Sequence, residues 1–228
     1  MATRSTPDAR RETADETPRE RILDAAFSAF MEGGFAETST LEIATRARVS
    51  KRELYALVGS KQDMLVACIG ARAKRLQAPA DLPEPHDWET LARVLTAFGT
   101  QLLREVSDPT VVAVFQLAIA EAVRAPEVAR TLNDIGVETG RAALRELMTR
   151  AQSAGLLSGK PAEMAEHFSG LLWGNLMMSL LLRVTDRPSP REITRRASAA
   201  TAAFLQLYPQ PNHAETGLPP SDALRSSD

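Results

Sequence analysis

Length, composition and charge restrict the classes to which this chain can belong. Its 228 residues, 44% of them hydrophobic and 5% aromatic, are enough to bury a sizeable core in one large or two small domains. A single cysteine, Cys68, excludes a disulfide or a thiolate cluster within one chain, which suits a reducing compartment. The net charge of −2 is uneven, because residues 1–75 hold 13 Lys and Arg against 11 Asp and Glu, which leaves 14 against 18 for the remainder. A surface that binds a polyanion is therefore expected in the first third of the chain.

The two ends of the chain carry no signal for regular structure or secretion. Residues 1–17 are polar and charged without an apolar stretch, and residues 209–228 are rich in proline with little apolar content. We expect a disordered N-terminal arm and a disordered C-terminal tail. The longest apolar stretch, residues 171–182, is too short to cross a bilayer of about 30 Å. The sequence thus predicts a soluble, cytoplasmic protein with no membrane partner.

Capping signals predict an all-α fold of about nine helices and no sheet. Thr17-Pro18-Arg19-Glu20 combines an N-cap, a proline in the first turn and an acid at the third helical position. The same arrangement of a serine and an acid three residues later begins at Ser39, Ser50 and Ser60. Five further helices are predicted to start at Asp87, Pro109, Pro126, Pro161 and Ser189. The longest predicted helical segments cover residues 60–77, 87–106, 109–123, 127–154, 161–182 and 190–208.

Residues 39–59 predict two short helices joined by a tight turn, which is a helix-turn-helix. Ala44 lies where the two helices must approach closely, Val49 follows the turn, and Leu54 faces the core. Ile43 and Leu57 are expected to fill the remaining inner sites. This spacing is the specific part of the signal, because a serine followed by an acid is ordinarily only a cap.

The second of these helices carries a basic N-terminus. Arg46, Arg48, Lys51 and Arg52 place four cations and no acid within residues 46–52. The free amides and positive dipole end at Ser50 suit phosphates and base edges in a major groove. A short basic run alone is more typical of a solvated helix face, so the prediction of DNA binding depends on the run and the spacing together.

Residues 18–68 resemble the DNA-binding domain of the tetracycline-repressor (TetR) family. The similarity lies in RERILDAAFSAFMEGGF and TSTLEIATRARVSKRELYALVGSKQDML. The resemblance implies a homodimeric transcriptional regulator, often a repressor, with an all-helical C-terminal domain that binds a small effector. It also implies contact with double-stranded DNA by Thr38, Ser39, Thr40, Lys51, Arg52, Tyr55 and Lys61. Arg48 stands where the family most often has glycine, so either the turn tolerates another residue or Arg48 accepts strain to place a cation beside phosphate.

Residues 69–208 are expected to form a helical ligand-binding and dimerisation domain. A proline-rich loop over residues 78–85 separates most of this domain from the DNA-binding part. The last two predicted helices are the expected dimer seam, because apolar residues cover too much of the first for one packed face and alanines on the second permit close helix approach. The residues expected at this interface are Leu172, Leu176, Leu180, Ala197, Ala200 and Phe204. The alternative is that both helices only close the core of the monomer.

An effector pocket between helices of this domain is a further expectation. Its candidate lining residues are Phe98, Leu102, Phe115, Gln116, Ile119, Met148, His167, Phe168, Trp173 and Asn175. Their composition favours an apolar or aromatic effector. Methionines and aromatic residues at helical spacing are more often plain core, and that alternative stays open.

The sequence offers little for catalysis, and we expect no enzymatic activity, no cofactor and no metal site. Residues 155–161 resemble a phosphate loop, but Pro161 replaces the Ser or Thr that would hold magnesium. Glu163 and His167 share a helix face without a nearby third ligand, which makes a poor zinc site. The alternative function from another class is a helical ligand-sequestering or interaction module that no longer reads DNA.

Overall fold

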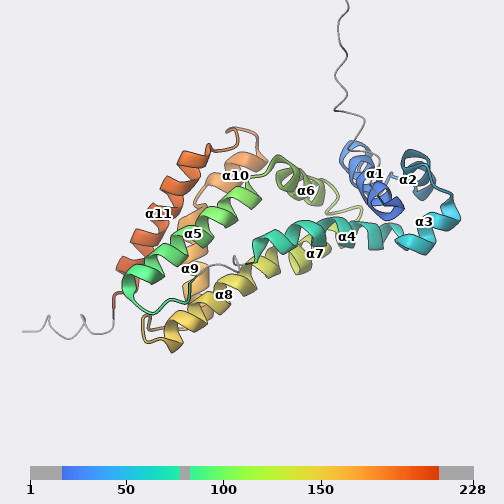
Figure 1. Ribbon diagram of the computed structural model, residues 1–228. Helices are drawn as coiled ribbons and strands as arrows, with labels where there is room; N and C mark the ends of the chain where they lie inside the picture. The colour runs from blue at the N-terminus through green and yellow to red at the C-terminus, as the bar shows by residue number, and fades with distance from the viewer. Residues whose placement is uncertain (1–16, 78–82, 211–228) are drawn as a thin grey trace, which may run out of the picture. The chain divides into compact units, whose positions relative to one another are not determined.

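The computed structural model describes residues 17–77 and 83–210, and the regular structure in these ranges is helical throughout (Figure 1). The α-helices are α1 (Pro18–Gly33), α2 (Thr40–Ala47), α3 (Lys51–Leu57), α4 (Lys61–Ala73), α5 (Trp88–Val106), α6 (Pro109–Ala120), α7 (Pro126–Thr131), α8 (Glu138–Ser153), α9 (Pro161–Trp173), α10 (Leu176–Leu181) and α11 (Pro190–Leu207). A 3-10 helix, η2 (Lys74–Leu76), follows α4, and a π-helix, η3 (Leu132–Val137), joins α7 to α8. The predicted all-α class is confirmed.

Over the same ranges, no helix is both long and apolar enough to cross a membrane. The predicted N-terminal arm and C-terminal tail lie almost wholly outside the described residues, and so does part of the predicted loop at 78–85.

Side-chain caps begin the first four helices as the sequence predicts. Thr17 and Ser60 form complete capping boxes, in which the cap hydroxyl accepts from the amide three residues on and the acid there accepts from the cap amide. The Thr17 amide lowers the pKa of Glu20, and the Ser60 hydroxyl lowers that of Asp63. The later predicted starts at 87, 109, 126, 161 and 189 are confirmed as well.

Three predicted helical segments are interrupted along their length. The segment predicted over 60–77 is α4 to Ala73 followed by η2, and the segment over 161–182 breaks at Gly174, whose φ is 47°. The segment over 127–154 changes to π-helical pairing at η3. These interruptions, rather than extra segments, raise the number of helices above the number predicted.

The helix predicted over 109–123 is apolar along nearly its whole length, a composition typical of a buried central helix. It ends as α6 at Ala120, and the side chains of Ile119 and Val123 are 62% and 94% exposed in the single chain. The apolar composition is therefore not matched by burial at the C-terminal end of this segment, where the chain turns towards α7.

The described chain divides into two compact units. Unit 1 contains residues 17–74 and Thr110–Val137, and unit 2 contains Arg75–Pro109 and residues 138–210. The helix-turn-helix region therefore shares a unit with α6, α7 and η3. The predicted domains, 18–68 and 69–208, group those three elements with the later helices instead.

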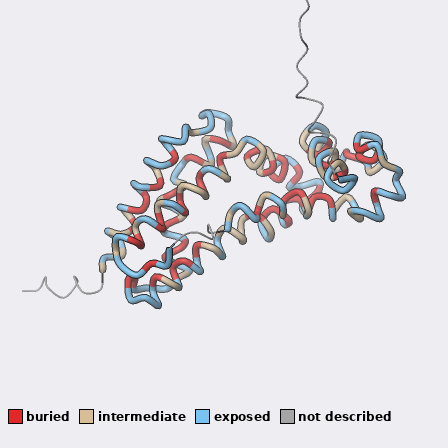
Figure 2. Tube along the Cα trace, in the orientation of Figure 1, coloured by how far each residue is buried: buried red, intermediate tan, exposed pale blue. Residues whose placement is uncertain are grey.

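Unit 1 has one hydrophobic core to which both of its chain segments contribute (Figure 2). Its fully or almost fully buried members include Ile22, Phe30, Ile43, Ala44, Leu54, Leu65, Val114, Leu117, Val128 and Leu132. Ala44 and Leu54 thus occupy the inner sites predicted for them. Leu57 does not, because it closes α3 at the surface with 40% of its area exposed.

Unit 2 is a helical bundle in which α5 packs along α11 and α9 packs against α8 and α11. Phe98, Phe168 and Phe204 are fully buried, and the rings of Phe168 and Phe204 meet edge to face at 5.5 Å between centroids. A Cβ on Gly99 would lie 3.3 Å from Phe168 Cζ, so the absence of a side chain there permits the close approach of α5 and α9.

Candidate functional site

The turn of the helix-turn-helix is closed by an arginine in the left-handed conformation. Arg48 has φ 56° and ψ 44°, and its amide donates to Thr45 O at 3.2 Å. The Val49 amide donates to Ala44 O at 3.0 Å, which completes a Schellman motif. This position usually holds glycine, because a left-handed conformation costs other residues roughly 1–2 kcal/mol. The structure thus accommodates Arg48 in strained backbone geometry and leaves its side chain exposed.

We define the recognition surface as Thr40, Arg48, Ser50, Lys51, Arg52 and Tyr55. The Ser50 hydroxyl caps α3 by accepting from the Glu53 amide at 3.1 Å. The three cations of this surface are exposed and, within residues 17–77 and 83–210, form no ion pair. Unpaired cations beside a helix N-terminus favour a phosphate partner.

Arg46, the fourth cation of the predicted basic run, does not belong to this surface. Its guanidinium pairs with Glu32 at 2.8 Å and with Glu42 at 2.7 Å. The hydrogen bond to Glu32 raises the pKa of Arg46 above its ordinary value. Two carboxylates thereby offset the charge of Arg46, which was predicted to contribute to DNA binding.

Tyr55 is held by the first helix of the motif. Its side chain is 47% exposed, and its hydroxyl lies 3.3 Å from the Thr40 hydroxyl. This hydrogen bond joins the N-terminus of α2 to the outer face of α3. It fixes the direction of the one aromatic side chain on the recognition surface.

Lys61 has a partner that the sequence did not reveal. Its ammonium donates to the backbone oxygens of Phe35, Ala36 and Thr38 at 2.8, 3.2 and 3.0 Å. It also lies 4.6 Å from the centroid of the Phe35 ring. The family resemblance implies that Lys61 contacts DNA, but here the carbonyls of the segment between α1 and α2 are the partners of its ammonium.

Thr38 and Ser39 also form hydrogen bonds within the protein, Thr38 as a buried residue and Ser39 as an exposed one. Thr38 is 4% exposed, and its hydroxyl donates to Ala29 O at 3.1 Å and to Gly34 O at 2.7 Å. The Ser39 hydroxyl caps α2 by accepting from the Glu42 amide at 3.1 Å. Both side chains thereby stabilise the segment that leads into α2, next to Thr40 of the recognition surface.

We define the α1–α2 loop as residues 34–39, and the turn after α6 contacts it from a distant part of the sequence. Glu121 is 5% exposed and accepts a hydrogen bond from the Ala36 amide at 3.4 Å. A Cβ on Gly34 would lie 2.5 Å from Glu121 Oε1, and Gly34 has φ 83°. Arg124 forms an ion pair with Glu37. Sequence patterns do not indicate this contact, because nothing local marks two segments that meet across so many residues.

The predicted effector residues fall in both units. Phe115, Gln116 and Ile119 lie on α6 in unit 1, and the other seven lie in unit 2. Four of those seven, namely Phe98, Leu102, Met148 and Phe168, are at most 2% exposed in the core of unit 2. His167 is exposed and bonds the Tyr208 hydroxyl at 2.6 Å, Trp173 is half-buried, and Asn175 is exposed at the break after α9.

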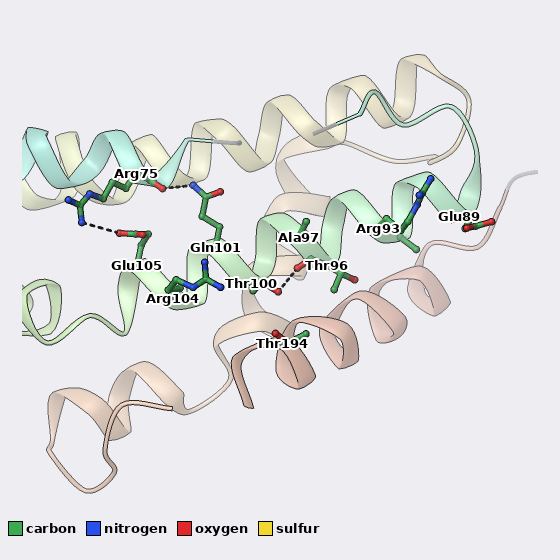
Figure 3. A pocket seen from close by; sticks show the side chains of 11 residues that line it. Arg75, Glu89, Arg93, Thr96, Ala97, Thr100, Gln101, Arg104, Glu105 and Thr194 are labelled. Carbon is green, nitrogen blue, oxygen red and sulfur yellow. Dashed lines mark hydrogen bonds and ion pairs between the residues drawn. The ribbon is translucent and has the colours of Figure 1, made fainter. Parts of the chain in front are cut away.

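Unit 2 carries an open groove of about 870 Å³ along α5 (Figure 3). None of the ten predicted effector residues lines it. Its lining residues are Arg75, Glu89, Ala92, Arg93, Thr96, Ala97, Thr100, Gln101, Arg104, Glu105 and Thr194. All but Arg75 and Thr194 belong to α5, and their side chains follow one face of that helix in Figure 3.

The six predicted dimer residues are already buried within the single chain. Leu172, Ala197 and Phe204 are 0% exposed, and Leu176, Leu180 and Ala200 are 9%, 7% and 4% exposed. The outward side of the same helices carries small and apolar side chains instead, among them Met178, Leu182, Ser198, Ala199 and Ala202.

Comparison with known proteins finds family models that match two separate parts of the chain. The family model for bacterial regulatory proteins of the tetR family matches residues 22–68, and the model for the C-terminal domain of AefR-like transcriptional repressors matches residues 93–210. A solved structure, that of the Flavonoid-responsive Regulator FrrA, is 31% identical, covers 85% of this chain and 97% of its own, and superposes with a TM-score of 0.71.

Two further relatives agree. The structure of a TetR transcriptional regulator from Agrobacterium tumefaciens is 27% identical, with 88% of this chain and 100% of that chain covered and a TM-score of 0.71. The HTH-type transcriptional repressor KstR of Mycolicibacterium smegmatis is 24% identical over 200 residues, which are 87% of this chain and 92% of KstR. The chain therefore belongs to the TetR family, as its sequence resemblance predicted, and is a DNA-binding transcriptional repressor.

Proposed function

We propose that this protein is a cytoplasmic homodimeric repressor that binds a two-fold symmetric operator through α3 and leaves it when a small effector binds unit 2. The observation that carries the proposal is the recognition surface around the N-terminus of α3, with Tyr55 and three exposed cations that form no ion pair among the described residues. An α-helix fits the major groove, and cations at its start can reach the flanking phosphates. Among the predicted DNA contacts, Thr38 and Lys61 act in this proposal by holding the α1–α2 loop.

The homodimer is proposed to form through the solvent face of α11 together with α10. Ser198 and Ala199 are exposed about one helical turn before the exposed Ala202, so a second helix can approach closely along these small side chains. Met178 and Leu182 on and after α10 are 61% and 63% exposed, and a partner would cover them. An isologous pair contains two copies of α3, which suits an operator with two half-sites.

Light scattering tests this interface with one substitution and a matched control. Ala202→Arg introduces a bulky charge on the proposed seam and should give monomers at micromolar concentration. Ser158→Arg adds the same charge at another exposed site and should leave the dimer intact. A dimeric Ala202→Arg variant would show that the two-fold contact lies elsewhere.

DNA binding is tested by titrating the protein against duplexes from the DNA flanking its own gene, with unrelated duplex as competitor and at two salt concentrations. Competitor-resistant binding at a two-fold symmetric site supports the proposal. Lys51→Ala should weaken binding to all sequences and reduce the salt slope by about 0.9 for each phosphate that the lysine neutralises. The matched control is Lys160→Ala, an exposed lysine of unit 2. Near-equal binding to any duplex would favour a helical ligand or interaction module instead.

A further inference from the structure

The groove along α5 has an uneven distribution of charge. Arg75, Arg104 and Glu105 lie towards one end, where the Glu105 carboxylate is 3.9 Å from Arg75, so this end holds two guanidinium groups and one carboxylate (Figure 3). Glu89 and Arg93 lie towards the other end and offset one another in charge. The end near Arg104 therefore carries a net positive charge, which suits one anionic group.

Arg104 is available for such a group. Its side chain is exposed, and over the described part of the chain its guanidinium forms no ion pair. The guanidinium of the neighbouring Arg75 has one ion pair among the described residues, the 3.9 Å contact with Glu105. A planar guanidinium matches the two oxygens of a carboxylate, so this end of the groove recognises a carboxylate better than a point anion.

The floor between the two ends is made of small side chains. Thr96, Ala97 and Thr100 follow one another along α5, and Thr194 of α11 lies opposite (Figure 3). The Thr100 hydroxyl donates to Thr96 O at 2.7 Å, which leaves its methyl group as the surface that a ligand can contact. Between Arg93 and Arg104 the helix rises about 16 Å at 1.5 Å per residue. The groove thus offers room for an extended apolar body with one charged head.

The groove is also connected to the segment that follows α4. Gln101 Nε2 donates to Arg75 O at 2.7 Å and to Gln77 O at 3.0 Å, so both of its amide protons form hydrogen bonds to residues 75–77. A ligand carboxylate that accepts from Gln101 must take one of these protons. Binding would then loosen the chain immediately after the helix that begins at Lys61.

We propose that the α5 groove binds an amphipathic carboxylate, with its head at Arg104 and Gln101 and its apolar body over Ala97, and that this ligand is the effector. The inference rests on the proposed effector control of DNA binding. It differs from the sequence-based expectation of an apolar or aromatic effector in a pocket whose candidate lining includes Phe98 and Phe168, because those two rings fill the core of unit 2.

Direct titration calorimetry on the full chain without DNA tests the groove separately from DNA binding. Dodecanoate, kept below its critical micelle concentration, is the probe. Dodecan-1-ol, which lacks the carboxylate, and acetate, which lacks the apolar chain, are the controls. We expect dodecanoate to bind and each control to bind at least about tenfold more weakly, since a charge-assisted hydrogen bond and apolar burial are both required. Equal binding of dodecanoate and dodecan-1-ol would overturn the assignment of a carboxylate.

Two groove variants and one matched control locate the site. Arg104→Gln should weaken dodecanoate binding about tenfold, and Ala97→Trp should block it by filling the floor of the groove. Arg130→Gln removes an exposed arginine of unit 1 and should change nothing. Binding that survives both groove variants would place the ligand elsewhere and refute the inference.

The link to DNA is measured last, on the operator complex. Dodecanoate should release wild-type protein from the operator and fail to release Arg104→Gln. An operator complex that ignores dodecanoate, despite intact groove binding, would refute the effector role of this site. Because operator binding is measured first without the probe, that result is distinct from a failure of the protein to bind DNA.

Discussion

Replacing Arg48 with glycine should change stability and DNA affinity in opposite directions. Arg48 sits at φ 56° and ψ 44°, where a residue with a Cβ is strained by roughly 1–2 kcal/mol. Glycine relieves that strain but has more freedom to lose on folding, by about 0.5–1 kcal/mol. The net effect is a gain of about 0.5–1 kcal/mol in the free energy of unfolding, or about 1–4 °C in Tm for a chain of this size.

The same substitution removes one exposed cation from the recognition surface. If Arg48 contacts a phosphate, the slope of log affinity against log salt should fall by about 0.9 for each half-site, or about 1.8 for a dimer. The decrease in affinity should be similar for operator and unrelated duplex, because a phosphate contact carries no base information.

Thermal melts and salt titrations of three variants separate the two effects. Arg48→Lys keeps the charge and the strain, so both readouts should stay close to those of the wild type. Arg183→Gly is the matched control for strain, because Arg183 follows α10 with φ 56° in the same hydrogen-bond pattern, its amide donating to Leu180 O at 3.1 Å. It should raise Tm without any effect on DNA binding.

Two outcomes would refute this reasoning. A lower Tm for Arg48→Gly would mean that the arginine side chain stabilises the fold by more than its backbone strain costs. An unchanged salt slope would mean that Arg48 is a turn residue without a phosphate contact.

The remaining predictions concern the α1–α2 loop and the buried thiol. Lys61→Met leaves three carbonyls without their charged donor and should cost about 2 kcal/mol of stability in denaturant melts, whereas unchanged stability would mean that these hydrogen bonds contribute little. Glu121→Ala should lower the free energy of unfolding by about 1–3 kcal/mol and weaken operator binding, because the Ala36 amide loses its acceptor. Glu37→Ala should lower it by no more than about 1 kcal/mol, since the ion pair of Glu37 with Arg124 is exposed. Burial raises the pKa of the Cys68 thiol to about 11, and the thiolate is the reactive form. Iodoacetamide at pH 8 should therefore label Cys68 only after unfolding, and rapid labelling of the native protein, detected by mass spectrometry, would contradict this.

The helix starts were predictable because each is a local event. A serine or threonine followed by an acid satisfies free amides within a few residues, so the sequence alone contains both partners of the hydrogen bonds that begin α1 and α4. The inner face of the helix-turn-helix was predictable for the same reason, apart from Leu57 at the end of a short helix. The break at Gly174 was missed because apolar residues continue on both sides of it.

The partners of charged side chains were not predictable, because they depend on which distant segments meet. Arg46 was counted with the cations that face DNA, yet Glu32 of α1 lies beside it. Lys61 was expected to contact DNA, yet its ammonium donates to three carbonyls of the α1–α2 loop. Glu121 joins that loop from the end of α6, a contact that no spacing rule contains.

The shared core of unit 1 has a consequence for the order of folding during synthesis. Val114, Leu117, Val128 and Leu132 complete a core to which α1 to α4 also contribute, so those four helices cannot close their hydrophobic surface when they first emerge. At about 5–20 residues per second, Leu132 follows Lys74 by about 3–12 s. During that interval the nascent helix-turn-helix exposes apolar surface, and a fragment ending at residue 74 should aggregate where the whole chain does not.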